Sequence, residues 1–320
     1  MIYDCFTFFN ENDLLEIRFN VLKDTVDKFV IIEATKTFTG KEKALNFDKD
    51  RFKEFQDKIE YIVLDEFPKT DDAWVYENVQ RNHIYNVLCK FCKDDDIVII
   101  SDCDEIPSVN AINDYKKNPV GIKSLEQELY YYYLNLKNFK GTYWYGARIL
   151  TFKEFKINNP EYKFDYNNFL PEEFNKNMTP NKIRMLKNCP RIKNGGWHFS
   201  FLGGTDKIIE KCKNYSHQEF NNEKFLNKEN IENCIIKGKD LFGRKNFKLL
   251  PVKIDESFPE YIKENVNKYN NFIFPYPENN LIFLFKIYFY KLLNFIYFKE
   301  KDGNKRIIKI LGIKFQYKHK

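Results

Sequence analysis

The stretch of residues 94–107 constrains this chain more than any other. Residues 97–100 are four consecutive β-branched aliphatic residues between polar neighbours, a pattern typical of a short strand buried on both faces. Asp102, Asp104 and Glu105 follow directly after this strand. In open α/β sheets, ligands bind where the chain leaves the carboxyl ends of the strands. We therefore expect the three acidic residues to lie in a ligand site.

The spacing of the two aspartates predicts a cation site. Residues two apart in extended chain point the same way, so Asp102 and Asp104 can converge on one ion. Carboxylate oxygens suit Mg²⁺ or Mn²⁺, and such an ion would neutralise a diphosphate. The alternative is a solvated acidic turn. Three neighbouring acids repel one another unless a positive group lies among them, so we favour a metal–nucleotide site.

Apolar runs typical of strands alternate with helical patterns through the first third of the chain. The expected strands cover residues 2–9, 29–33, 59–64 and 97–100, and the expected helices about 12–22, 52–55, 72–90 and 109–115. This alternation predicts an α/β fold with a mostly parallel, Rossmann-type sheet flanked by helices. Neither G-x-G-x-x-G after the first strand nor a P-loop occurs, which disfavours dinucleotide oxidoreductases and P-loop NTPases.

The middle of the chain has a different texture. Tyrosine-rich and tryptophan-containing runs predict strands at 129–136 and 142–150, and the polar residues 153–190 predict a long loop. Residues 195–204 contain four glycines in a chain with only 12, which predicts tight backbone turns or a close approach to a ligand. His198 lies inside this segment, either as a ligand or as a satisfied core residue. Helices are expected at 205–220 and 228–236.

Residues 281–298 are strongly apolar and aromatic, with two interrupting lysines, Lys286 and Lys291, and a basic end at 305–320. The lysines argue against a bilayer-spanning helix and favour an amphipathic helix at a membrane interface. The alternative is a helix packed on the catalytic domain. The N-terminus shows no signal peptide. We expect a cytoplasmic protein whose tail contacts the inner face of the cytoplasmic membrane.

Composition excludes several classes of protein. With 320 residues, 43% of them hydrophobic, the chain can bury a sizeable core. Its net charge of +6 comes from 52 basic and 46 acidic residues, so the charges are mixed and do not indicate a nucleic-acid binder. Cys89 and Cys92 form a C-x-x-C without a second pair, which favours reduced thiols over a zinc site.

Three segments, residues 2–11, 30–40 and 101–107, resemble glycosyltransferase family 17. Residues 195–200 are similar to its C-terminal signature, and residues 80–82 to the segment before its Asp-x-Asp strand. The resemblance covers roughly residues 1–250. It implies a GT-A-type fold, a nucleotide-sugar donor (UDP-GlcNAc in the characterised members), a divalent metal and inversion at the anomeric carbon.

Pattern and resemblance together assign the site. The predicted metal ligands are Asp102, Asp104 and His198, and the predicted phosphate partners are Lys43 and Arg81. Contacts to the nucleotide sugar are also expected from Glu33, Asn82, Trp197 and His198. An inverting transfer needs a carboxylate that deprotonates the acceptor hydroxyl. The candidate catalytic carboxylates are Asp104, which also binds the metal, and Glu105, Glu128 and Asp206 as alternatives for the base.

We expect a catalytic domain over residues 1–250, with a donor half up to about 120 and an acceptor half from 121, and a basic helical tail over 251–320. The animal members have an N-terminal membrane anchor, for which we expect no counterpart in this chain. In this respect, and in its basic, apolar tail, the chain resembles bacterial enzymes of lipopolysaccharide or capsule assembly. The implied acceptor is therefore a surface glycan or glycolipid. Two alternatives remain: a metal-dependent nucleotidyl- or phosphotransferase, and a non-catalytic carbohydrate-binding or scaffold protein.

Overall fold

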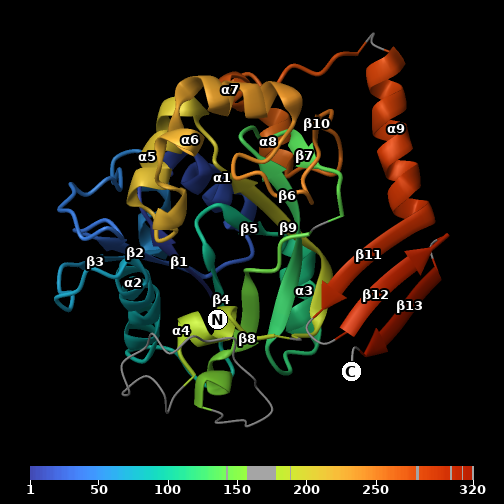
Figure 1. Cartoon of the computed structure of the whole chain (residues 1–320). Coiled ribbons are helices and arrows are strands. Elements are labelled where there is room, and N and C mark those ends of the chain that lie inside the picture. Colours follow the sequence, from blue (N-terminus) through green and yellow to red (C-terminus); the bar gives the residue numbers. More distant parts are fainter. Residues whose placement is uncertain are drawn as a thin grey trace. The chain divides into compact units, whose positions relative to one another are not determined.

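The computed structural model describes residues 1–141, 143–156, 178–187, 189–278, 281–302, 305–311 and 313–318 (Figure 1). The chain divides into two compact units. Unit 1 contains residues 1–127, 145–197 and 213–218, and unit 2 contains residues 128–144, 198–212 and 219–320. Strands β6 (Lys123–Tyr131) and β9 (Arg191–Ser200) begin in unit 1 and end in unit 2.

A mixed sheet forms the centre of unit 1 (Figure 1). Its order is β6-β8-β4-β1-β2-β3, and β5 pairs with β9. The pairs β4-β1, β1-β2 and β2-β3 are parallel, whereas β8 pairs antiparallel with β4 and with the start of β6. The strands are β1 (Ile2–Phe8), β2 (Lys28–Ala34), β3 (Ile59–Leu64), β4 (Ile97–Asp102), β5 (Glu105–Pro107) and β8 (Arg148–Thr151). The helices are α1 (Asn12–Leu22), η1 (Lys53–Lys58), α2 (Ala73–Leu88), α3 (Val109–Lys117), η2 (Phe152–Lys156) and α4 (Pro180–Arg184).

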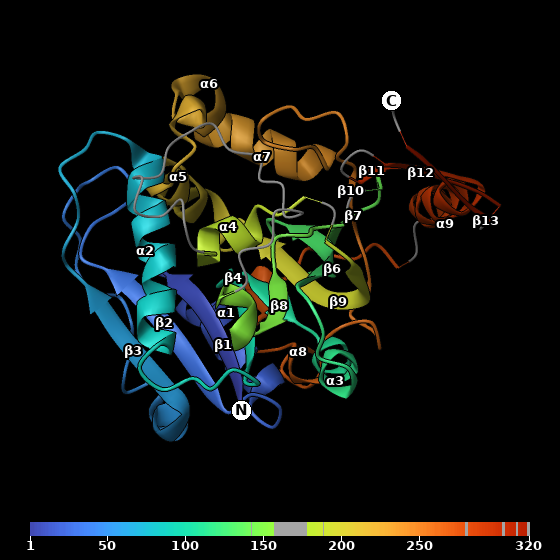
Figure 2. The same ribbon diagram turned by 90° about the horizontal axis from the view of Figure 1, so that it is seen from below.

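Helices cover both faces of this sheet (Figure 2). Successive side chains of a strand point to opposite faces, so Cys5 and Phe6 enter different core layers. Phe6 lies in the layer with Phe19 of α1 and Ile112 of α3, and Cys5 lies in the layer with Ile84 of α2 and with α4. Burial on both faces explains why these strands are continuous apolar runs.

Short polar residues start the helices that border the acidic stretch. The Asp72 side chain accepts the N–H of Trp74 at the start of α2. Ser108 accepts the N–H of Ala111 at the start of α3, and its hydroxyl also donates to the carbonyl of Asn194 at 2.6 Å. These side chains satisfy N–H groups that have no partner inside the helix, which fixes where each helix begins.

Unit 2 is built around the end of β6, which pairs with β7, and β7 pairs with β10. Asn135 joins distant segments here, because its amide donates to the carbonyls of Val252 and Phe274 and accepts the N–H of Phe274. The remaining elements lie wholly or partly in unit 2. They are β7 (Leu136–Asn138), α5 (Gly204–Asn214), η4 (Gln218–Phe220), α6 (Glu223–Leu226), α7 (Lys228–Lys237), β10 (Leu249–Pro251), α8 (Glu260–Glu264), η5 (Asn270–Phe272), α9 (Leu281–Ile296), β11 (Tyr297–Asp302), β12 (Lys305–Ile310) and β13 (Ile313–Lys318).

The α/β class and the first four predicted strands are confirmed. The expectation of a mostly parallel sheet is wrong, because β8, β6, β7 and β10 pair antiparallel. The predicted strand at 129–136 is interrupted after Tyr131, because Tyr132 takes the left-handed conformation with φ 70°. In the second predicted strand, residues 148–151 alone form β8, and most of the predicted loop lies outside the described residues.

The C-terminal tail is helical only in part. The predicted helix is confirmed as α9, but β11, β12 and β13 form an antiparallel three-stranded sheet where a helical tail was expected. Alternating apolar and basic residues suit strands better than helices, which explains the difference. Across the ranges that the structure describes, no helix has the length and apolar character needed to cross a bilayer.

Candidate active site

The acidic turn after β4 rests on a fully buried ion pair. Arg18 of α1 binds Asp4 of β1 through two hydrogen bonds of 2.6 and 2.7 Å, and both side chains are inaccessible to solvent. One Arg18 nitrogen donates to the carbonyl oxygens of Asp102, Cys103 and Glu105 at 2.9–3.2 Å. Another donates to the Ser101 hydroxyl. Arg18 therefore holds the backbone of the turn in place through these hydrogen bonds.

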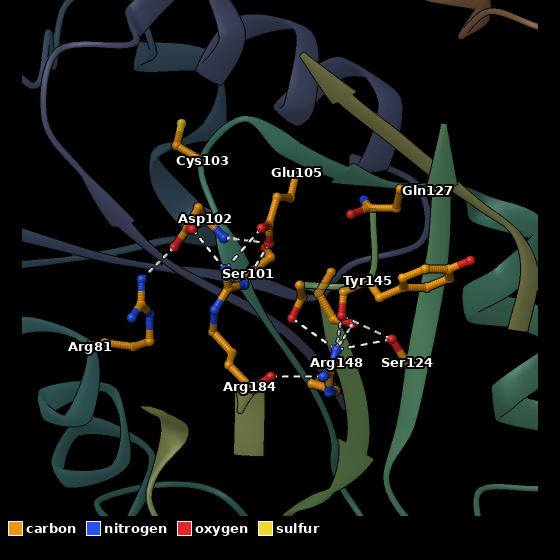
Figure 3. A network of polar contacts seen from close by, with 12 residues as sticks. Arg81, Ser101, Asp102, Cys103, Glu105, Ser124, Gln127, Tyr145, Arg148 and Arg184 are labelled. Carbon is orange, nitrogen blue, oxygen red and sulfur yellow. Dashed lines mark hydrogen bonds and ion pairs between the residues drawn. The ribbon is translucent and has the colours of Figure 1, made fainter. Parts of the chain in front are cut away.

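Two arginines converge on the carboxylates of this turn (Figure 3). Arg81 of α2 donates to one oxygen of Asp102 at 2.9 Å, and Arg184 of α4 donates to the other at 2.7 Å. Arg184 also binds both oxygens of Glu105, at 2.5 and 2.9 Å. Glu105 in turn accepts the backbone N–H of Asp102 at 2.9 Å. We call Arg81, Asp102, Glu105 and Arg184 the Asp102 cluster.

The two arginines keep the Asp102 carboxylate charged. Burial alone would raise the pKa of Asp102, but Arg184 and Arg81 outweigh burial and hold that pKa below its ordinary value. Burial alone would lower the pKa of Arg184, whereas Asp102 and Glu105 raise it above its ordinary value. The side chain of Asp102 is 32% exposed, and that of Glu105 is fully buried. Asp102 is thus the carboxylate of the pair that a ligand can reach.

Arg148 of β8 positions the segment that carries Arg184. It donates to the carbonyl oxygens of Arg184 and Leu186 at 2.7 and 3.2 Å, and to the hydroxyl of Ser124 at 2.9 Å (Figure 3). Burial lowers the pKa of Arg148. A buried guanidinium that bonds mainly carbonyl oxygens acts as a fixed support for the backbone, so the position of Arg184 depends on β8.

Residues of α2 hold the beginning of α4. Arg81 donates to Glu77 at 2.7 Å and to the side-chain oxygen of Asn181 at 3.0 Å. Asn82 accepts the backbone N–H of Asn181 at 3.0 Å. The Arg81 Nε and the Asn82 amide nitrogen are buried and have no hydrogen-bond partner among the residues that the structure describes. The described residues therefore leave the hydrogen-bonding capacity of these two buried donors unused.

Glu33 and Lys43, both predicted at the donor site, bind each other. Glu33 at the end of β2 is fully buried and accepts hydrogen bonds from Lys43 Nζ at 2.6 Å, from the backbone of Asn46 and Phe47, and from the Tyr61 hydroxyl at 2.9 Å. These bonds anchor the loop after β2 to the sheet. The hydrogen bonds of this pair thus form a loop-anchoring network that shares no member with the Asp102 cluster.

The remaining predicted residues divide between the two units. Asp104 and the half-buried Trp197 belong to unit 1, and the negative charge of the buried Asp104 acts on Asp102. His198, Glu128 and Asp206 belong to unit 2. Among the described residues there is no group of three or more His, Cys, Asp or Glu side chains placed to hold a metal ion.

The three unit 2 residues have separate surroundings. The buried His198 ring lies 4.6 Å from the Trp144 ring, centroid to centroid. Glu128 accepts hydrogen bonds from Tyr130 at 2.9 Å and from Lys137 at 2.5 Å. Asp206 is exposed at the surface and pairs with Lys228 at 2.7 Å. Of the four candidate catalytic carboxylates, the structure brings Asp104 and Glu105 into one turn.

Gly195 and Gly196 approach neighbouring backbone closely, and the expected approach to a ligand stays a prediction. A Cβ atom on Gly196, which has φ 130°, would lie 2.1 Å from the carbonyl oxygen of Ile106. A Cβ on Gly195 would lie 2.5 Å from the backbone nitrogen of Glu126. Side chains at these positions would push β9 away from its neighbours. The glycines therefore hold β9 directly against the strand that follows the acidic turn.

The structure adds four residues that the sequence analysis did not assign: Asp4, Arg18, Arg148 and Arg184. A signal existed for Arg18, because it occupies the apolar face of α1, where a charge requires a buried counter-ion. Arg184 gave no such signal, since it stands in a polar stretch without periodicity.

Comparison with known proteins decides the family. Residues 1–275 match the sequence profile of glycosyltransferase family 17. The chain belongs to this family. A stretch of 112 residues is 32% identical to the β-1,4-mannosyl-glycoprotein 4-β-N-acetylglucosaminyltransferases of Homo sapiens and Rattus norvegicus, and covers 32% of this family 17 chain and 21% of each relative. The corresponding Mus musculus protein is 31% identical over the same length.

Proposed function

We propose that this family 17 chain is an inverting, metal-dependent glycosyltransferase. It would move a sugar, GlcNAc or a related hexose, from a UDP-sugar to a hydroxyl group of a surface-glycan acceptor. The observation that carries the proposal is the partly exposed Asp102, held between two arginines at the carboxyl end of β4. Membership of the family and the N-acetylglucosaminyltransferase names of the relatives support the sugar chemistry.

Asp102 and Asp104 fit a hard divalent cation by their donor chemistry. Mg²⁺ commonly binds through one or two carboxylates, substrate phosphates and water, so a third protein ligand is not required. When bound, Mn²⁺ or Mg²⁺ supplies positive charge that stabilises the departing UDP. His198 stays a proposed metal ligand or phosphate partner.

The arginines of the Asp102 cluster are proposed to assist the same leaving group. Arg81 and Arg184 bind carboxylates in this structure, Arg184 with two nitrogens on Glu105, and guanidinium groups can bind phosphate in the same two-nitrogen way. Asn82 stays a proposed contact to the nucleotide. Preorganised donors of this kind stabilise charge as it develops in the transition state.

Glu105 is better suited to positioning than to proton transfer. Its carboxylate is fully buried and accepts hydrogen bonds from Arg184 and from the Asp102 backbone, which leaves it poorly accessible to an acceptor hydroxyl. We therefore propose that the base is Glu128 or Asp206, and that Glu105 orients Arg184 and the turn.

The test is UDP release from a panel of UDP-sugars in the presence of Mn²⁺, repeated with EDTA. Asp102→Asn is expected to reduce turnover by at least about a hundredfold, the usual cost of losing a key charge-stabilising group. The matched control is Asp95→Asn, because Asp95 belongs to the same acidic run but is 95% exposed before β4. Full activity of Asp102→Asn would refute the proposed site.

Two further outcomes distinguish the alternatives. Turnover that is insensitive to EDTA would mean that the arginines neutralise the leaving group without a metal. Release of inorganic diphosphate or formation of a phosphorylated product would instead indicate a nucleotidyl- or phosphotransferase. Glycan binding without turnover of any nucleotide sugar would favour a non-catalytic protein.

A further inference from the structure

Most of the described side chains of helix α9 in unit 2 are exposed. Ile287 is buried against Phe139 and Leu250, which lie on or next to β7 and β10. The helix leaves large apolar side chains in solvent, and Phe285 and Tyr288 are each 68% exposed. The other exposed apolar side chains of α9 are Phe289, Leu292, Leu293, Phe295 and Ile296. A helix face this apolar is normally covered in a soluble domain.

The sheet that follows α9 also exposes apolar side chains. Ile313, Phe315 and Tyr317 alternate along β13, so they share one face, and each is about half exposed or more. Ile310 lies opposite Ile313 in the register and is exposed too. The backbone of Leu311 donates a hydrogen bond to the carbonyl of Ile296, which joins the sheet to the end of α9.

This apolar tail is also the most basic part of the chain. Residues 281–320 contain ten Lys or Arg and two Asp or Glu, a net charge of +8. The whole chain carries +6, so the other 280 residues carry −2. The positive charge of the protein is thus concentrated in the segment that exposes its apolar residues.

Charge selects among the occupants that could cover the tail. A second copy would bring another +8 segment against the first, and like charges in contact oppose association. A bilayer with anionic lipids offers both an apolar layer for aromatic and aliphatic side chains and negative headgroups for lysine and arginine. We infer that α9 and the β11–β13 sheet form a docking surface for an anionic lipid bilayer, binding at the interface without crossing it.

The experiment measures cosedimentation of the full chain with phosphatidylcholine vesicles, with and without phosphatidylglycerol. Binding is expected to need the anionic lipid and to fall as the salt concentration rises. The double variant Phe285→Glu/Tyr288→Glu should reduce the partition coefficient at least tenfold.

The matched control is Ile236→Glu on α7, since Ile236 is 75% exposed but lies outside the tail. It should bind vesicles as the unmodified chain does. Thermal unfolding of each variant checks that it is folded. Absence of binding to anionic vesicles, or equal loss in the Ile236→Glu control, would overturn the inference. A dimer in solution that the double variant dissociates, without vesicle binding, would show that the face covers a second copy. None of these results depends on transferase activity.

Discussion

The buried pair between Arg18 and Asp4 makes a quantitative prediction for stability. Replacing Arg18 with Met leaves the Asp4 carboxylate inside the core without a counter-ion, because both side chains are fully buried. Removing one partner of such a pair typically costs about 3–5 kcal/mol in the free energy of unfolding. The carbonyl oxygens of Asp102, Cys103 and Glu105 also lose their donor, so the loss should lie toward the upper end of that range.

The assay is urea-induced unfolding followed by circular dichroism. The matched control is Arg51→Met, because Arg51 also pairs with acids of α1, Asp13 and Glu16, but at a partly exposed site. An exposed pair of this kind contributes at most about 1 kcal/mol. The double variant Asp4→Leu/Arg18→Met should recover part of the loss, since it removes the unpaired charge. If Arg18→Met costs no more than Arg51→Met, the reasoning is refuted.

Three further predictions concern the site and its surroundings. Arg184→Lys keeps the positive charge, but a lysine cannot bind Glu105 with two nitrogens and also reach Asp102. The kcat should therefore fall about a hundredfold while the circular dichroism spectrum stays unchanged, and an unchanged kcat would contradict this. Burial, followed by the charge of Asp96, raises the pKa of Cys92 to about 12, so iodoacetamide at neutral pH should modify the exposed Cys89 and spare Cys92 in peptide mass spectra. Burial, followed by the charge of Lys90, lowers the pKa of His83, so the folded state binds a proton less readily than the unfolded state. The free energy of unfolding should therefore decline as the pH falls below about 6.5. Urea titrations at several pH values should show a flatter decline for His83→Gln.

The sequence predicted the parallel half of the sheet because those strands are buried on both faces. Uninterrupted runs such as residues 29–33 and 97–100 leave few alternatives to a strand, and the turn after β4 lies where the pattern placed it. The break between β6 and β7 was not predictable in this way. It depends on the left-handed conformation of Tyr132 within a run of tyrosines, each of which favours a strand.

The site was predictable in its acids and not in its arginines. Asp102 could be predicted because it directly follows a buried strand, whereas Arg184 lies in a short helix more than 80 residues further along the chain. Such long-range ion pairs depend on the tertiary fold, and a single sequence carries no local pattern for them. The same limit applies to Glu33 and Lys43, whose mutual hydrogen bond appears only when the loop after β2 is in place.

The bonding among Asp102, Glu105 and Arg184 restricts how this sequence can vary. Replacing Arg184 alone leaves the fully buried Glu105 without a counter-ion, and replacing Glu105 alone leaves a buried guanidinium with fewer partners. Viable changes are therefore expected to arise in combination. In a random library selected for folded protein, substitutions at Glu105 and Arg184 should co-occur far more often than chance, whereas Asp95 should change freely. Asp102, Glu105 and Arg184 would then be kept together or be replaced together.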